Sequence, residues 1–252
     1  MTHNRLFPIT LLLLALCLLP HCRGKNPTTS GVIDSTQSDI PTVIIKYDQP
    51  INGYMVTVKL HPLEGEHYGP AEMQFSNANY SFTVNVDSFD EDHFNYETTL
   101  HDGDTITLHY TPLPEGQVIS PDCTFFFSDV DFDGTKELIV REPLAGPRGI
   151  GAYHIYELDG TQRKDEPLSA IDDMTDFDKA EKSITLNYYY GIILGFTSLK
   201  YCLREDGLFA LTDSTHTDYK METINDIITD SVRVHYHRQG DKMVLIKTEV
   251  FN

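Results

Sequence analysis

The sequence predicts an all-β fold of antiparallel hairpins, propeller-like or sandwich-like, with at most one or two short helices. From residue 42 onward, segments rich in β-branched and aromatic residues alternate in part between apolar and polar positions. Clusters of Gly, Pro, Asn and Asp, such as DQPING, HDGD and PLPEG, separate these segments and are typical of turns. Few windows carry a helical period, and 14 Tyr and 13 Phe can supply an aromatic core.

Residues 1–22 have the pattern of an export signal. The short segment MTHNR precedes the apolar run LFPITLLLLALCLLP, which is too short for a comfortable membrane span. The polar residues 23–41 are predicted to form a flexible tether. Cys22 is the candidate for lipidation, and a plain secreted form is the alternative. We therefore expect an exported protein, either periplasmic or held at the outer membrane or cell surface as a lipoprotein.

The remaining chain is predicted to contain a front β part over 42–118 and a back β part over 119–252. The front part includes TVIIKY, YMVTVKL, YSFTVNV and TITLHYT, and the back part includes TFFF, KELIV, SITLNYYY and MVLIKTEV. The best helical candidate is 168–181, with a turn or two of helix. Three glycines mark the tight turns of predicted hairpins: Gly160, Gly207 and Gly240. The segment PLPEGQ separates the two parts. They could share one hydrophobic core or form two small cores.

The charge balance narrows the classes of partner. With 19 basic and 38 acidic residues, the net charge of -19 should repel nucleic acid and anionic lipid. The same charge should attract cations and basic protein surfaces. We find no nucleophile elbow, Cys-His pattern or metalloprotease helix in the sequence, so we expect a protein that is not an enzyme.

Two cysteines lie in the back part without metal-type spacing. In an oxidising compartment, Cys123 and Cys202 could form one disulfide. The alternative is a pair of buried free thiols that pack as small hydrophobic residues.

The segment SDVDFDGTKEL carries the strongest chemical signal in the chain. Its acidic residues alternate, and a glycine follows them, as in the calcium-loop pattern D-x-[DN]-x-[DN]-G. The flanking runs TFFF and LIV predict strands, so the loop should connect two strands while Phe132 and Leu138 point away from the acidic set. The predicted calcium ligands are the side chains of Asp129, Asp131, Asp133 and Glu137 and the backbone carbonyl group of Thr135. The alternative is a solvated acidic turn without an ion.

The longer stretch FFFSDVDFDGTKELIVREPLAGPRGIGAYHIYELDG resembles exported bacterial proteins with an FG-GAP-like calcium loop. The resemblance extends to GYMVTVKLHPLEGEHYGPAEMQF and, more faintly, to RQGDKMVLIKTEV. It implies a small all-β, propeller-like protein in which Asp129, Asp131, Asp133 and Glu137 hold Ca²⁺. One branch of this family consists of periplasmic immunity proteins that block peptidoglycan hydrolases, as lysozyme inhibitors do. We therefore expect a protein partner, for which a basic cell-wall hydrolase is the candidate.

Weaker signals define the competing hypotheses. His235 and His237 form an H-x-H pair that could hold zinc or simply lie on a surface strand. A carbohydrate-binding surface lipoprotein could use Tyr188 and Tyr190 on one face for stacking on sugars, with Tyr189 inward. A hydrolase would need carboxylates that meet only in the fold, and the candidates are Asp102 and Asp104. Other recognition candidates are the acidic segment 87–94 and the loop around Arg148.

Overall fold

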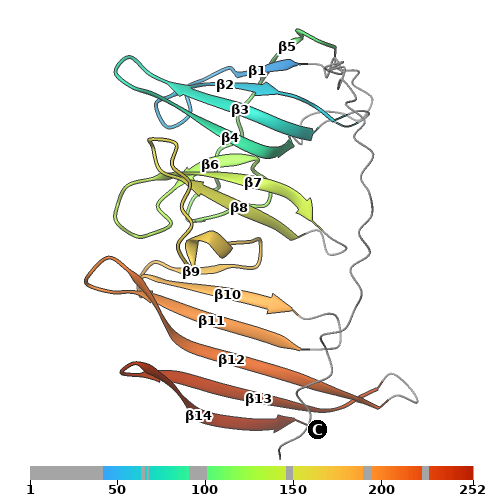
Figure 1. Cartoon of the computed structure of the whole chain (residues 1–252), viewed down its shortest axis with the longest axis vertical. Helices are drawn as coiled ribbons and strands as arrows, with labels where there is room; N and C mark the ends of the chain where they lie inside the picture. Colours follow the sequence, from blue (N-terminus) through green and yellow to red (C-terminus); the bar gives the residue numbers. More distant parts are fainter. Residues whose placement is uncertain are drawn as a thin grey trace, which may run out of the picture. The chain divides into compact units, whose positions relative to one another are not determined.

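Alternating apolar residues build a five-stranded sheet from the first part of the chain (Figure 1). The strand order is β4-β3-β2-β1-β5, in which β1 and β5 are parallel and the other neighbours are antiparallel. Every second residue of β1 to β3, and of β4 as far as Val86, is buried, because successive side chains of a strand point to opposite faces. The strands are β1 (Val43–Tyr47), β2 (Met55–Leu60), β3 (Tyr68–Ser76), β4 (Ser81–Asp90) and β5 (Thr105–Leu108).

A three-stranded antiparallel sheet follows, with β7 in its centre. Its strands are β6 (Phe125–Ser128), β7 (Glu137–Ala145) and β8 (Ile150–Tyr156). All four residues of β6 are buried, which agrees with the continuous apolar run TFFF. This sheet carries the candidate site on its β6–β7 connection.

A six-stranded antiparallel sheet, in the order β14-β13-β12-β11-β10-β9, completes the fold. A 3-10 turn, η1 (Leu168–Ala170), precedes β9 (Asp176–Asp178), β10 (Ser183–Tyr189), β11 (Phe196–Leu203), β12 (Phe209–Glu222), β13 (Ile227–Gln239) and β14 (Lys242–Phe251). Gly207 and Gly240, at φ values of 77° and 63°, lie in the hairpin turns before β12 and β14, as predicted.

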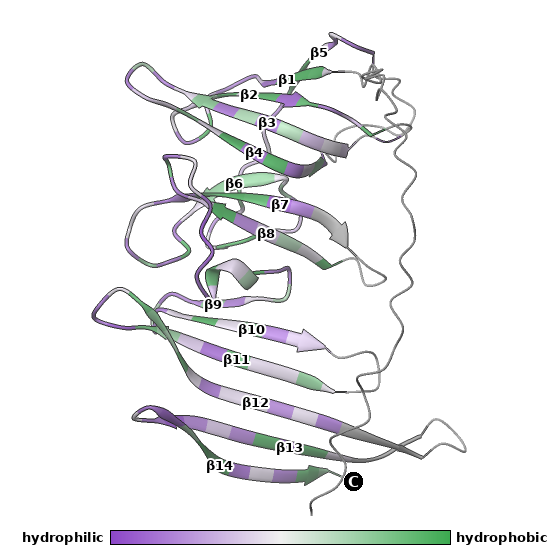
Figure 2. Cartoon of the chain, viewed as in Figure 1, coloured by the Kyte–Doolittle hydropathy of each residue, from purple (hydrophilic) through white to green (hydrophobic). Residues whose placement is uncertain are grey.

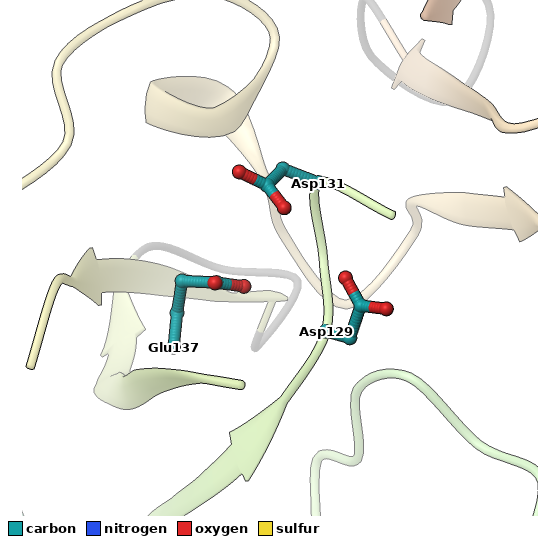
Figure 3. A group of neighbouring side chains, drawn as sticks. All are labelled: Asp129, Asp131 and Glu137. Atoms are coloured by element: carbon teal, nitrogen blue, oxygen red, sulfur yellow. The ribbon is translucent and has the colours of Figure 1, made fainter. Parts of the chain in front are cut away.

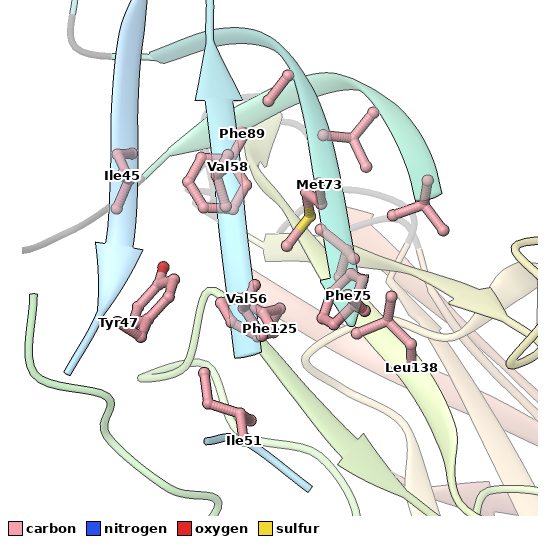
Figure 4. Packing of buried hydrophobic residues seen from close by; sticks show 14 of the residues in the cluster. Ile45, Tyr47, Ile51, Val56, Val58, Met73, Phe75, Phe89, Phe125 and Leu138 are labelled. Atoms are coloured by element: carbon pink, nitrogen blue, oxygen red, sulfur yellow. The ribbon is translucent and has the colours of Figure 1, made fainter. Parts of the chain in front are cut away.

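Two hydrophobic cores meet at the three-stranded sheet. Phe125 of β6 and Leu138 of β7 pack into the first core with the residues of β1 to β4 (Figure 4). Their neighbours Phe126 and Ile139 point the other way and pack into the second core with the residues of β10 and β11. Because adjacent side chains of one strand serve different cores, the three-stranded sheet is shared between them.

The helical candidate over 168–181 forms only the 3-10 turn η1, and the short strand β9 follows it. A tertiary network explains the difference, because it fixes Asp173 in an irregular segment between these two elements. The Asp173 carboxylate accepts hydrogen bonds from Arg141 at 2.9 Å and from the Tyr153 hydroxyl at 2.5 Å. The neighbouring Asp172 accepts a turn bond from the Met174 N–H at 2.9 Å, and such local bonds compete with helix formation.

The structure is a computed structural model that describes residues 42–63, 66, 68–90, 101–145, 150–189, 195–222 and 227–251. Within these ranges the all-β prediction is confirmed, with three sheets and one 3-10 turn. None of the helices described there is long and apolar enough to cross a membrane. Several predicted features lie outside the described residues, namely the export signal 1–22, the tether 23–41 with Cys22, residues 91–94 of the acidic segment, Arg148 and Tyr190.

Candidate metal centre

The acidic loop connects β6 to β7, as the sequence predicts. Ser128 pairs with Glu137 in the antiparallel ladder, so residues 129–136 form the connection. Gly134 has a φ of 94°, which is a conformation that glycine adopts without a steric cost. Phe132 adopts a φ of 63° and its side chain is only 8% exposed, packed into the second core. Leu138 is fully buried in the first core, so the prediction that these two side chains point away from the acidic set is confirmed.

Three of the four predicted carboxylates converge (Figure 3). Asp129, Asp131 and Glu137 each offer an oxygen, and these three oxygens lie within 4.8 Å of one another. Asp133 is exposed and lies outside this group, because its Oδ1 accepts the N–H of Thr135 at 2.6 Å. The structure therefore keeps Asp133 and Thr135 together as a turn beside the carboxylate group.

Backbone donors orient all three carboxylates, that of Asp131 through the Asp133 N–H. The Gly134 N–H donates to Asp129 Oδ2 at 3.2 Å, and the Val130 N–H donates to Glu137 Oε2 at 3.0 Å. The other oxygen of Asp129, Oδ1, is buried and has no hydrogen-bond partner among the described residues. A buried acceptor without a partner costs about 1–3 kcal/mol, and more if it is charged. A cation ligated by Asp129 Oδ1 would remove this cost, so the residues present fit a metal ion.

Arg163 is a functional neighbour that the sequence did not identify. Its Nη1 donates to Asp131 Oδ2 at 3.2 Å and to Glu157 Oε1 at 2.8 Å, and its Nε donates to Asp165 at 2.9 Å. The other oxygen of Asp131, Oδ1, accepts the N–H of Asp133 at 3.2 Å. Arg163 therefore orients Asp131 from the outside of the group and offsets part of its charge. Its position 32 residues from Asp131 in the sequence leaves no local signal for this contact.

Burial and nearby negative charge disfavour the charged forms of Glu137 and Asp131. Burial raises the pKa of Glu137 to about 7, and the nearby charges of Asp131 and Asp133 add to the increase. Burial also raises the pKa of Asp131, although its hydrogen bonds oppose the change. Without a cation, Glu137 is therefore partly protonated near neutral pH.

The pKa of Glu137 gives the first testable prediction. Because this pKa is about 7 in the folded chain and its ordinary value is 4.5, the folded state binds more protons between these values. In chelator, the free energy of unfolding should fall as the pH rises through this window, by on the order of 3 kcal/mol at complete ionisation. Urea melts of the wild type from pH 5 to 8 in chelator measure this slope.

Two variants separate the contribution of Glu137 from the rest of the protein. Glu137→Gln should lose most of the slope, because glutamine does not titrate. Glu72→Gln, at an exposed position of β3, should keep it. A Glu137→Gln protein with the wild-type slope would contradict the assignment.

The remaining residues named from the sequence do not join this group. His235 Nε2 contacts Glu249 at 2.8 Å, and His237 Nδ1 contacts Asp213 at 2.6 Å, so each ring pairs across the sheet with a different carboxylate. Among the described residues, Asp129, Asp131 and Glu137 form the only group of three potential ligands. The structure therefore gives no support to zinc at the H-x-H pair.

The carboxylates proposed for a hydrolase lie in a turn before β5. Asp102 Oδ1 accepts the N–H of Thr42 at 2.9 Å, and Asp104 Oδ2 accepts the N–H of His101 at 2.8 Å. Gly103 between them has a φ of 82°. Both carboxylates therefore stabilise the turn through backbone groups.

The structure also places the tyrosines of β10 and the two cysteines of the back part. The expected orientation of the tyrosines is wrong, because Tyr189 is 48% exposed while Tyr188 packs against the second core. This follows from the register of β10, in which Leu186 and Tyr188 share the buried face. Cys123 and Cys202 are both free thiols, with contacts to Thr111 and Thr212 respectively, the first being buried.

Comparison with known proteins gives one structural neighbour. No family model matches the chain, and no curated protein matches it significantly. A solved structure of a Xanthomonas type IV secretion system related protein has a similar fold, with a TM-score of 0.53 and 14% sequence identity. The similarity covers 83% of this chain and 95% of the Xanthomonas chain. At this identity, the comparison shows a shared fold.

Proposed function

We propose that the chain is an exported, calcium-binding β protein without enzymatic activity, which binds a partner protein. The observation that carries the calcium proposal is the convergence of Asp129, Asp131 and Glu137, a group that also contains the unpartnered oxygen Asp129 Oδ1. Carboxylate oxygens are the ligands that Ca²⁺ prefers, and backbone carbonyls and waters can complete its six to eight positions. Mg²⁺ fits less well, because it retains several waters and needs near-ideal octahedral geometry.

The position of the group favours a stabilising role for the ion. Its ligands lie on both sides of the β6–β7 connection, since Asp129 follows β6 and Glu137 begins β7. These two strands contribute side chains to both cores. Bound Ca²⁺ would attract the carboxylates that otherwise repel one another. It would therefore stabilise the pairing of β6 with β7 at this end of the shared sheet.

The partner surface that we propose is the end of the six-stranded sheet formed by β14. Neither core includes a described residue of β13 or β14. β14 is an edge strand, and its C-terminal end is hydrophobic (Figure 2). Its exposed apolar residues are Val244 (36%), Leu245 (51%), Ile246 (57%), Val250 (65%) and Phe251 (42%). An exposed edge with several large apolar side chains is typical of a protein-binding surface.

Three observations support a basic cell-wall hydrolase as the partner. The net charge of -19 favours association with a cationic protein. The resemblance to calcium-loop proteins includes inhibitors of peptidoglycan hydrolases. The Xanthomonas protein of similar fold is related to a type IV secretion system, which agrees with a role outside the cytoplasm.

The partner proposal predicts inhibition of a cationic hydrolase. We expect the purified protein to slow the clearing of a cell-wall suspension by lysozyme. The double variant Leu245→Asp/Ile246→Asp should inhibit at least tenfold less well, because it places charge in the apolar part of β14. Turbidity measurements at increasing protein concentration determine the inhibition.

A control variant on the same strand makes this test specific. Thr248→Asp adds a carboxylate at an exposed polar position of β14 and should inhibit like the wild type. If neither lysozyme nor a panel of cell-wall amidases and endopeptidases is inhibited, the hydrolase is not the partner.

A further inference from the structure

A cavity of about 580 Å³ lies beside the carboxylate loop. Segments that are far apart in the sequence line it: the turn after β1, the loop 110–117, the β6–β7 connection and the β9–β10 turn. Its volume falls within the range of roughly 300–1,000 Å³ that is usual for pockets binding small molecules. Loops held by a rigid sheet scaffold are frequent places for binding sites.

Three lysines line this cavity in an otherwise acidic protein. Lys136, Lys179 and Lys182 all line it, whereas the chain as a whole has 19 basic and 38 acidic residues. Among the described residues, no carboxylate forms an ion pair with any of the three, in contrast to Lys200 and Lys247, which pair with glutamates. Three ammonium groups around one cavity repel one another, and a bound anion would reverse this repulsion.

The acidic and apolar lining residues define the rest of the cavity. Its carboxylates are Glu115 and Asp129, of which Asp129 faces the candidate metal centre. Tyr110, Leu113 and Phe127 contribute apolar surface. A ligand that carries both an anionic group and an apolar body would therefore match the lining.

Three residues that line the cavity have an uncommon backbone conformation. The described residues include three non-glycine residues with positive φ: Asn52 at 49°, Phe132 at 63° and Lys182 at 48°. All three line the cavity. The Lys182 Nζ also donates to the Phe132 carbonyl oxygen at 3.2 Å and so connects two of the lining segments. Residues in this conformation are uncommon and cluster at functional sites.

We propose that this cavity binds a small organic anion bearing a carboxylate or phosphate group. Lys136, Lys179 and Lys182 hold the charged group, and the ligand body lies against Tyr110 and Leu113. The proposal rests on the lysines and the cavity, and it does not depend on calcium at the neighbouring carboxylates.

Calorimetric titration of the purified protein, freed of calcium and then dialysed free of chelator, tests this proposal. The probes are phenyl phosphate and benzoate, with inorganic phosphate and benzyl alcohol for comparison. We expect saturable binding of at least one organic anion, and the preferred one identifies the charged group. Inorganic phosphate should bind more weakly than phenyl phosphate, and benzyl alcohol should not bind.

Lysine variants localise the binding. Lys136→Gln and Lys179→Gln should each weaken it about tenfold, which corresponds to the loss of one charged hydrogen bond. These two side chains make no hydrogen bond or ion pair among the described residues, so the variants should melt like the wild type. Lys182→Gln should also weaken binding, although it removes the contact with Phe132. Lys242→Gln, at an exposed position of β14, is the matched control and should bind normally.

The proposal is overturned if neither organic anion binds, or if Lys242→Gln weakens binding as much as the cavity variants do. Equal affinity for inorganic phosphate and phenyl phosphate would overturn the role of the ligand body. Because calcium is removed before the titration, a failed calcium site leaves this result unchanged, and the two proposals fail separately.

Discussion

Calcium is expected to raise the melting temperature of the wild-type protein by roughly 10 °C relative to chelator. A ligand at a thousand times its dissociation constant contributes about 4 kcal/mol, and each kcal/mol shifts the midpoint of a domain of this size by about 2–4 °C. The physical reason is the carboxylate group of Asp129, Asp131 and Glu137, in which repulsion and a buried unpartnered oxygen are relieved by the ion. Thermal melts at millimolar calcium and in chelator measure the shift.

Substitution of one ligand should remove most of this response. Asp131→Asn keeps the size of the side chain but loses a charged oxygen, so we expect the calcium-dependent shift to fall to less than half. Asp241→Asn, in the exposed turn between β13 and β14, makes the same chemical change away from the group and should respond like the wild type. If calcium leaves the wild-type melt unmoved, the loop is a solvated acidic turn.

Truncation of either face of β7 should destabilise the whole protein. Leu138 and Ile139 are adjacent and both fully buried, but Leu138 packs in the first core and Ile139 in the second. Leu138→Ala and Ile139→Ala should each lower the free energy of unfolding by about 2–5 kcal/mol through lost burial and the cavity left behind. Because both cores share this sheet, we expect one cooperative transition in urea for both variants.

An exposed isoleucine provides the control for Leu138→Ala and Ile139→Ala. Ile246→Ala removes a similar side chain from a position that is 57% exposed, and it should change stability by about 0.5 kcal/mol or less. If the wild type unfolds in two transitions, and each core variant moves a different one, then the two cores are independent and the shared sheet does not couple them.

Much of the local structure follows from the order of residues alone. The alternation in β1 to β4 predicts strands, because side chains with a period of two can be buried together only on one face of a sheet. The spacing of Asp129 and Asp131 before Gly134, between two apolar runs, predicts an acidic loop between strands. Each of these signals acts over a few residues, so it is visible in the sequence.

In the candidate site, the local sequence pattern does not predict which carboxylates converge. The pattern assigns Asp133 the same role as Asp129, but Asp133 is exposed and hydrogen-bonded to Thr135, while Asp129 is half-buried. The difference arises from the packing of Phe132 between them, which turns the chain at a positive φ. Burial of this kind depends on residues distant in the sequence.

By itself, the sequence determined the all-β class, the hairpin turns at Gly207 and Gly240, and the acidic loop between two strands. Only the tertiary structure decided that Arg163 contacts Asp131, that the stretch 168–181 keeps a single 3-10 turn, and that lysines from separate segments line one cavity. The physical reason is that backbone propensity and side-chain alternation are local properties. Burial, ion pairing and the sharing of a sheet between two cores are set by contacts that form only when distant segments pack together.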